Sequence, residues 1–130
     1  MDKAALRKMM MEKRDSLSRD YVEESGRRVL ENLLKAGFLG GQGHNPACAF
    51  IYVSMKNELP SWDIIRCCLD SRIKVCVPRI EKSPEGRIMK AYRIDDPDRE
   101  LAPGHFGVME PVFEGEEAAR REVFPGEMDL

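Results

Sequence analysis

The sequence contains no apolar run that could cross a membrane, because a spanning helix needs about 20 consecutive apolar residues. Its start, MDKAALRKMMMEKRD, is charged and amphipathic and lacks the unbroken apolar centre of a secretory signal peptide. It also lacks a large excess of either charge, since 21 basic and 23 acidic residues leave a net charge of -2. These absences argue against a membrane protein and a general polyanion binder, so neither a membrane nor a nucleic acid is expected as a partner.

Cysteine is scarce and does not occur in pairs with metal-binding spacing. The four cysteines form no C-x-x-C motif, and adjacent Cys67 and Cys68 are a poor start for a zinc site. Cys48 and Cys76 lie inside the apolar runs ACAFIYV and IKVCVP, where cysteine serves as a small buried hydrophobe. The pattern predicts reduced core thiols and a cytoplasmic protein.

Familiar catalytic motifs are also missing. There is no G-x-x-x-x-G-K-[ST], G-x-G-x-x-G or H-E-x-x-H, and His44 and His105 lie in expected loops without a neighbouring nucleophile. From spacing alone the best candidate is Glu58, which follows the carboxyl end of a predicted buried strand, where open α/β sheets bind ligands. Its carboxylate can accept a pair of hydrogen bonds from an amino-heterocycle. A solvated turn glutamate is the open alternative.

The N-terminal quarter has the pattern of two helices. Residues 2–15 lack Gly and Pro and are rich in good helix formers. Ser18 is a suitable N-cap for a second helix, and Gly37 suits its C-terminal stop. Between them, apolar residues recur at helical spacing: Val22, Val29, Leu30, Leu33 and Leu34.

After residue 45 the period changes to that of an α/β domain. Residues 49–54 and 73–78 have the composition of buried strands, and Ser61 is placed to cap a helix between them. A turn at 83–86 separates the second strand from a more exposed strand at 87–94. We therefore expect one α/β domain over residues 1–130, with three α/β/α layers, a mostly parallel sheet and an N-terminal helical pair.

Charge is unevenly distributed along the chain. Residues 1–14 hold five basic and two acidic residues, a net +3, whereas residues 95–130 hold eleven acidic residues against three arginines, a net -8. The basic first helix could be an anion site or a solvated face, and composition leaves both open.

Several short segments, in this order and spacing, resemble the 5-formyltetrahydrofolate cyclo-ligases, also called 5,10-methenyltetrahydrofolate synthetases. The resemblance covers essentially the whole chain. It is carried by these segments: Lys3-x-x-Leu6-Arg7, Tyr52–Leu59 (YVSMKNEL), Val77-Pro78-Arg79, the strand with Met89, Phe106–Pro111 (FGVMEP) and Glu127–Leu130 (EMDL).

The sequence departs from the family at its end. Family members continue for roughly another third of their length, through a Gly-Arg-Leu-Gly-x-Gly-x-Gly-Tyr-Tyr-Asp loop that wraps the nucleotide phosphates and contributes to the magnesium site. The chain is therefore interpreted as a truncated member, about two thirds of a cyclo-ligase domain. The family is monomeric, and a truncated chain is expected to self-associate or melt at low temperature.

The resemblance implies a reaction: ATP-dependent closure of 5-formyltetrahydrofolate to 5,10-methenyltetrahydrofolate, with release of ADP and phosphate. The formyl oxygen is phosphorylated, N10 of the same folate attacks, and phosphate leaves. Such chemistry needs positioning and charge neutralisation rather than a protein nucleophile. ATP and Mg²⁺ are the implied cofactors, with the metal ligands expected in the missing part.

The resemblance also assigns roles to residues of this chain. Lys3 and Arg7, four apart on one helix face, are expected to bind ATP. Folate contacts are expected from these residues: Val53, Met55, Glu58 and Phe106. Arg79 is a weaker candidate for the glutamate tail or a phosphate. Two alternatives stay open: an inactive fragment that retains folate or anion binding, and an unrelated α/β interaction domain with an acidic docking surface.

Overall fold

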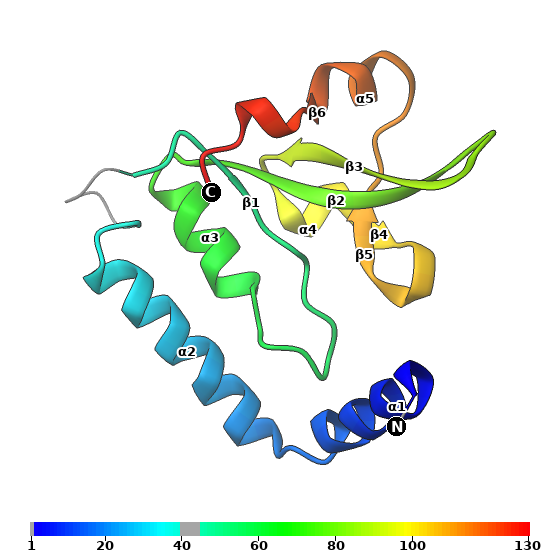
Figure 1. The fold of residues 1–130 in the computed structure, drawn as a ribbon. Coiled ribbons are helices and arrows are strands. Elements are labelled where there is room, and N and C mark those ends of the chain that lie inside the picture. Colours follow the sequence, from blue (N-terminus) through cyan, green and yellow to red (C-terminus); the bar gives the residue numbers. More distant parts are fainter. Residues whose placement is uncertain (1, 40–44) are drawn as a thin grey trace.

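The computed structural model describes residues 2–39 and 45–130, which form a sheet with helices beside it (Figure 1). Two helices come first, α1 (Lys3–Asp15) and α2 (Arg19–Lys35). The predicted cap is confirmed, because Ser18 Oγ accepts from the backbone N–H of Tyr21 at 3.1 Å. Gly37, just beyond α2, has a φ of 79°, which suits the predicted glycine stop. The expected N-terminal helical pair is confirmed.

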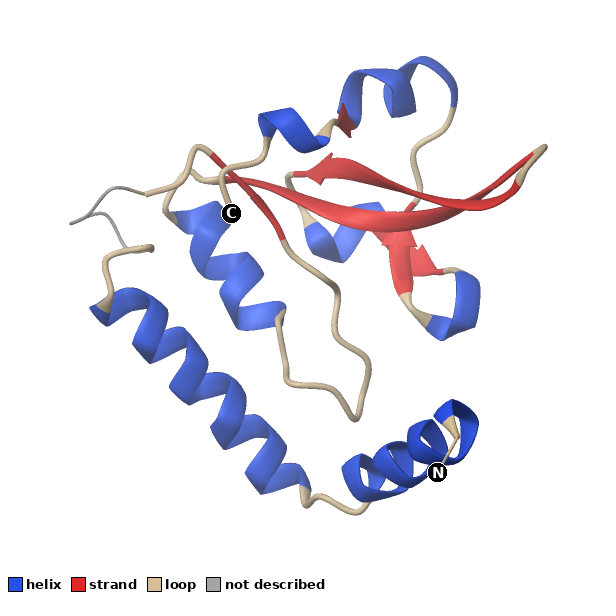
Figure 2. Cartoon of the chain, in the orientation of Figure 1, coloured by secondary structure: helices blue, strands red, loops and turns tan. Residues whose placement is uncertain are grey.

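A four-stranded sheet follows (Figure 2). Its strands lie in the order β1 (Cys48–Phe50), β2 (Lys74–Ser83), β3 (Gly86–Ile94) and β6 (Glu122–Val123), and a separate sheet pairs β4 (Leu101–Pro103) with β5 (Met109–Pro111). No helix in the described residues is long and apolar enough to cross a bilayer. The remaining elements are, in chain order, α3 (Trp62–Asp70), α4 (Pro97–Glu100), the 3-10 helix η1 (His105–Gly107), α5 (Gly115–Arg121) and the 3-10 helix η2 (Pro125–Glu127).

The α/β class is confirmed, but the expected mostly parallel sheet is wrong. Only β1 and β2 run parallel among the described strands, joined through α3, whereas β3 pairs antiparallel with both β2 and β6. The reason is the short turn after Ser83. A connection this tight joins only antiparallel strands, since a parallel neighbour needs a crossover of a dozen residues or more.

One face of the sheet carries the larger core. Val75, Val77 and Ile94 are fully buried there against Ile65 and Cys68 of α3, with Leu30 and Leu33 of α2 packed outside them. Alternate residues of β2 point to this face, as the two-residue period of a strand requires. The burial fixes α3, and with it the loop that connects β1 to α3.

The opposite face has a smaller core built on cysteine. Cys48, Cys76 and Ala91 are buried there beneath Val123 and Met128 of the C-terminal segment. That segment contains only short helices, so it covers this face in place of the long second helical layer expected from three layers. The predicted burial of Cys48 and Cys76 is confirmed, and burial raises the pKa of the Cys76 thiol to about 12.

The C-terminal residues lie along the free edge of β1. The Asp129 carboxylate accepts from the N–H groups of Ala47 and Cys48, at 2.9 and 3.0 Å. The backbone N–H of Phe50 donates to the carbonyl of Leu130 at 2.7 Å. Backbone groups that β1 does not share with β2 are thereby satisfied.

Candidate functional site

The loop between β1 and α3 leaves the carboxyl end of the one described parallel strand pair. Its strand ends at Phe50, four residues earlier than predicted, and Ser54 and Ser61 close the base of the loop. Ser61 Oγ donates to the carbonyl of Tyr52 at 2.6 Å and accepts from the N–H of Ser54 at 3.0 Å. Ser61 is the N-cap residue of α3, as predicted, but its side chain is occupied by the loop and makes no cap hydrogen bond.

Glu58 holds the tip of this loop together. Its Oε1 accepts from the N–H of Met55 at 2.8 Å, while its own N–H donates to the Met55 carbonyl at 3.1 Å. Tyr52 donates its hydroxyl to the Leu59 carbonyl at 2.6 Å, and burial together with the Glu58 charge raises the Tyr52 pKa. The half-buried carboxylate is thus fixed in place, with Oε1 used by the loop itself.

Phe106 lies in the turn between β4 and β5 and has unusual backbone geometry. It is 74% exposed, and its φ of 59° is in the left-handed region that non-glycine residues rarely adopt. The Arg87 guanidinium carbon lies 5.3 Å from its ring centroid. A Cβ built on the next residue, Gly107, would lie 3.9 Å from Met55 Cε, so the Phe106 turn and the Met55 loop are neighbours.

The helix α1 presents its basic residues to solvent. Lys3 and Arg7 are exposed, and neither forms an ion pair with another residue in the described part of the chain. The end of α1 is joined to the loop after β1, since Asn57 Nδ2 donates to Asp15 Oδ1 at 2.8 Å. A shallow groove of about 510 Å³ runs along α1, lined by Arg7, Met10, Met11, Lys13, Arg14 and Leu17.

The structure therefore brings together three of the predicted folate contacts, Met55, Glu58 and Phe106, on two adjacent loops. Val53 differs, because it is 2% exposed and packs in the larger core behind the loop. His44 falls outside the described residues. His105 is next to Phe106, where its ring Nδ1 lies 3.4 Å from a Glu110 carboxylate oxygen.

A cavity of about 790 Å³ adjoins the same loop on the side of α2 and α3. Gly26 allows α2 to approach, because a Cβ there would lie 3.0 Å from Pro60 Cδ. The cavity is lined by Arg19, Val22, Glu23, Gly26, Arg27, Ser54, Met55, Lys56, Pro60, Trp62, Asp63 and Arg66. Met55 thus borders both this cavity and the Phe106 turn.

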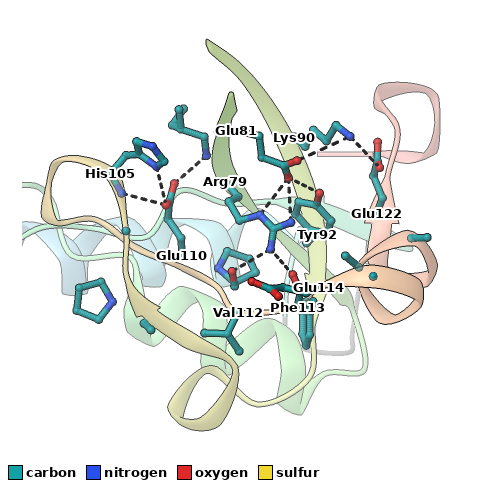
Figure 3. Close-up of a pocket in the computed structure, with 18 residues that line it drawn as sticks. Arg79, Glu81, Lys90, Tyr92, His105, Glu110, Val112, Phe113, Glu114 and Glu122 are labelled. Atoms are coloured by element: carbon teal, nitrogen blue, oxygen red, sulfur yellow. Dashed lines mark hydrogen bonds and ion pairs between the residues drawn. The ribbon is translucent and has the colours of Figure 1, made fainter. Parts of the chain in front are cut away.

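A second cavity, of about 800 Å³, lies over β2 and β3 and is lined by a cluster of charged residues (Figure 3). Arg79 is central to it. Its guanidinium donates to the carbonyls of Pro111 and Phe113, at 3.1 and 2.6 Å, and lies 4.1 Å above the Tyr92 ring. Every nitrogen of the group has a partner, since Nε and Nη2 both contact Glu81 at 3.0 Å. Arg79 thus braces the fold, and contacts within the fold use most of the donors that its weaker assignment to the folate tail or a phosphate would need.

The carboxylate of Glu81 completes this cluster. Burial raises its pKa, but hydrogen bonds from Tyr92 and Arg79 and the charges of Arg79 and Lys90 outweigh burial and hold the pKa below the ordinary value. The Tyr92 pKa is raised to about 12, by burial and by the hydrogen bond to Glu81. Arg79 and Lys90 offset part of the charge of the four carboxylates that line this cavity, those of Glu81, Glu110, Glu114 and Glu122.

Glu110 is the residue of this region that sequence reasoning missed. It is 7% exposed, and its carboxylate bridges the backbone of β2 and the Phe106 turn. A lone acid inside the apolar run Val108–Phe113 (VMEPVF) is a signal of a buried carboxylate, because apolar flanks remove it from solvent. Its partner Ile80 is thirty positions away, so no local pattern could have identified the contact.

The described residues do not assemble a magnesium site by themselves. Within residues 2–39 and 45–130, no three His, Cys, Asp or Glu side chains form a group that could hold a metal ion.

The fold is similar to the NMR structure of 5,10-methenyltetrahydrofolate synthetase from Aquifex aeolicus. The TM-score is 0.69 at 27% sequence identity, and the match covers 100% of this chain and 59% of that chain. The resemblance to the synthetase family is confirmed. No family model and no curated protein matches the sequence. The chain therefore spans 59% of the length of that synthetase.

Proposed function

We propose that this chain carries the folate-binding loops of a 5-formyltetrahydrofolate cyclo-ligase, the enzyme that closes 5-formyltetrahydrofolate to 5,10-methenyltetrahydrofolate using ATP. The observation that supports it most directly is the pairing of the Met55–Glu58 loop with the Phe106 turn. Each carries residues that the family resemblance assigns to folate, although about fifty residues separate them in the sequence.

The reaction needs two contributions, activation of the formyl oxygen and positioning of the folate. ATP supplies the phosphoryl group that turns the formyl oxygen into a leaving group. The protein must hold a flat pterin ring and keep the formyl carbon close to N10, which is a task of positioning. Phe106 offers an exposed aromatic face for stacking, and Met55 adds apolar contact. Glu58, fixed by its own loop, accepts hydrogen bonds from the pterin amino and ring N–H groups.

Lys3 and Arg7 are proposed to bind the triphosphate from one face of α1. Both are exposed and carry no counter-ion among the described residues, so their charge is available to an anion. Mg²⁺ bound together with ATP would neutralise part of the phosphate charge, and within residues 2–39 and 45–130 no group of three ligating side chains that could hold it forms. We place this activity in the cytoplasm, in keeping with four free cysteines.

The first experiment follows the melting temperature of the chain while 5-formyltetrahydrofolate is added. A ligand that binds only the folded state stabilises it by about 2.7 kcal/mol at a hundredfold excess over its Kd. Glu58→Gln should abolish this shift, because the amide can still accept from the Met55 N–H but replaces an acceptor oxygen with a donor nitrogen. Glu85→Gln, on the turn between β2 and β3, is the matched control and should leave the shift intact.

Turnover is then measured by the ultraviolet absorbance of the methenyl product in the presence of ATP and Mg²⁺. Turnover that is lost when Lys3 and Arg7 are both replaced by Gln, and kept in Lys8→Gln, would support the full reaction. Folate binding without turnover would support an inactive, folate-binding chain. Neither binding nor turnover at any attainable concentration would contradict the folate proposal.

A further inference from the structure

The turn that carries Phe106 has a conformation that Phe106 itself does not favour. Phe106 has a φ of 59°, where a non-glycine residue is strained, whereas the φ of 76° at Gly107 suits a glycine. Such a conformation persists only where surrounding contacts impose it. The Phe106 side chain is 74% exposed, so packing of its own ring does not hold the turn.

Glu110 connects this turn to β2. Its Oε1 accepts from the backbone N–H of His105 at 3.0 Å and lies 3.4 Å from His105 Nδ1, and its Oε2 accepts from the backbone N–H of Ile80 at 2.8 Å. Figure 3 shows the carboxylate between the turn and the strand. One buried carboxylate therefore connects the residue before Phe106 to the middle of β2.

Glu110, on β5, also satisfies a part of β2 that pairs with no strand on this edge among the described residues. The parallel partner β1 pairs with β2 only from Lys74 to Cys76, whereas β2 continues to Ser83. The Ile80 N–H lies in this unpaired part, and the carboxylate accepts from it in place of a backbone carbonyl. The anchor at this end lies within a hairpin, because β2 pairs with β3 from Val75 to Ser83.

Gly104 shows how closely the carboxylate fits against the turn. A Cβ at this position would lie 1.8 Å from Glu110 Oε1 and 2.5 Å from its Cδ, distances that the structure could not accommodate without moving Glu110. The φ of Gly104 is -120°, so the need for glycine comes from the close approach of the carboxylate rather than from a left-handed backbone. The turn is further closed by the Gly104 N–H, which donates to the Val108 carbonyl at 2.7 Å.

We propose that Glu110 is a positioning residue for the substrate: it fixes the His105–Gly107 turn to β2 so that the Phe106 ring is presented next to the Met55 loop. The proposal rests on the folate-binding function proposed above. We assign Glu110 a positioning role rather than a substrate contact, because its carboxylate is buried beneath the turn and is used by the backbone N–H groups of His105 and Ile80. Both oxygens have to accept, so a carboxylate is needed and an amide of the same size does not replace it.

The test begins without ligand, by amide hydrogen exchange on the whole chain. In Glu110→Gln, one of the two N–H groups faces an NH₂ donor, so the amides of His105, Gly107 and Val108 should exchange at least tenfold faster, while those of Val75 and Val77 keep their rates. Glu81→Gln, a carboxylate change in the neighbouring cluster, is the matched control and should leave the turn unchanged. Unchanged exchange at the turn in Glu110→Gln would overturn the proposal.

The second arm measures affinity for 5-formyltetrahydrofolate in a double-mutant cycle. Glu110→Gln should weaken binding about tenfold in the wild-type background and not at all in a Phe106→Ala background, because its effect acts through the ring. An equal loss in both backgrounds would overturn the proposal, since it is what a general loss of stability produces. If the wild-type chain binds no folate, the proposed function fails, and hydrogen exchange still decides whether Glu110 holds the turn.

A second variant covers the case in which Glu110→Gln does not fold. Gly104→Ala keeps the carboxylate and its charge but pushes it from its place, so the same turn amides should exchange faster and folate should bind more weakly. Slow exchange at the turn in Gly104→Ala would contradict the proposed positioning role of Glu110.

Discussion

The two sides of the Phe106 turn differ in how their polar groups are used. In the cluster of Arg79, Glu81 and Tyr92, the guanidinium, carboxylate and hydroxyl groups all have partners within the fold, and the Arg79 side chain is 17% exposed. On the other side, Phe106 and Met55 are exposed and Lys3 and Arg7 carry no partner among the described residues. A cavity lined by charge is not by itself a site. The proposed site differs because it combines exposed apolar side chains with charged side chains that have no ion-pair partner among the described residues.

This difference is sharpened most by removing Arg79. Arg79→Ala leaves the Glu81 carboxylate without its main counter-charge and two carbonyls without a donor, so we expect a loss of about 3 kcal/mol in the free energy of unfolding. Urea unfolding measures it. Arg99→Ala, at an arginine that is 87% exposed, is the control and should stay within about 0.5 kcal/mol. An Arg79→Ala protein of normal stability that no longer binds folate would instead place the cluster in the site.

Phe106→Ala should weaken folate binding while leaving stability almost unchanged, the opposite of Arg79→Ala. The ring is exposed, so the free energy of unfolding should change by no more than about 0.5 kcal/mol, whereas lost stacking should weaken 5-formyltetrahydrofolate binding about tenfold. Calorimetric titration measures the affinity. Phe124→Ala, at a phenylalanine that is 58% exposed between β6 and η2, is the matched control. Equal affinity in the wild type and Phe106→Ala would remove the turn from the site.

Alkaline pH gives the smallest of the three effects, and comparison with Tyr92→Phe isolates the part that comes from the charged cluster. The folded-state pKa of Tyr92 is raised from 10.0 to about 12, because burial and the bond to Glu81 favour the neutral hydroxyl. Its contribution to stability is therefore fully present below pH 10 and is lost as the pH rises through about 12. Urea midpoints across this window should fall for the wild type and fall less for Tyr92→Phe. Identical slopes for the two proteins would contradict the assignment.

The sequence predicted what is decided locally. The Ser18 cap, the glycine stop at Gly37 and the burial of Cys48 and Cys76 follow from neighbours within a few positions. Contacts across long separations were not predictable in this way. Ser61 is the N-cap residue of α3, as expected, but its side chain bonds to Ser54 and Tyr52 across the loop.

The candidate site divides along the same line. The family resemblance pointed to Met55, Glu58 and Phe106, and these lie on adjoining loops of the structure. The resemblance also pointed to Val53, whose side chain is buried in the larger core. Glu110 depends on a hydrogen bond to Ile80 that only the folded chain creates.

The most direct measurement is a titration of the isotope-labelled chain with 5-formyltetrahydrofolate, followed by the amide signals in NMR spectra. The largest shifts of the amide signals should occur at residues 52–59 and 104–108. The amide signals of the charged cluster should not shift: Arg79, Glu81, Tyr92 and Glu122. Changes concentrated on that charged cluster, or no change at saturating folate, would contradict the assignment of the site to the two loops.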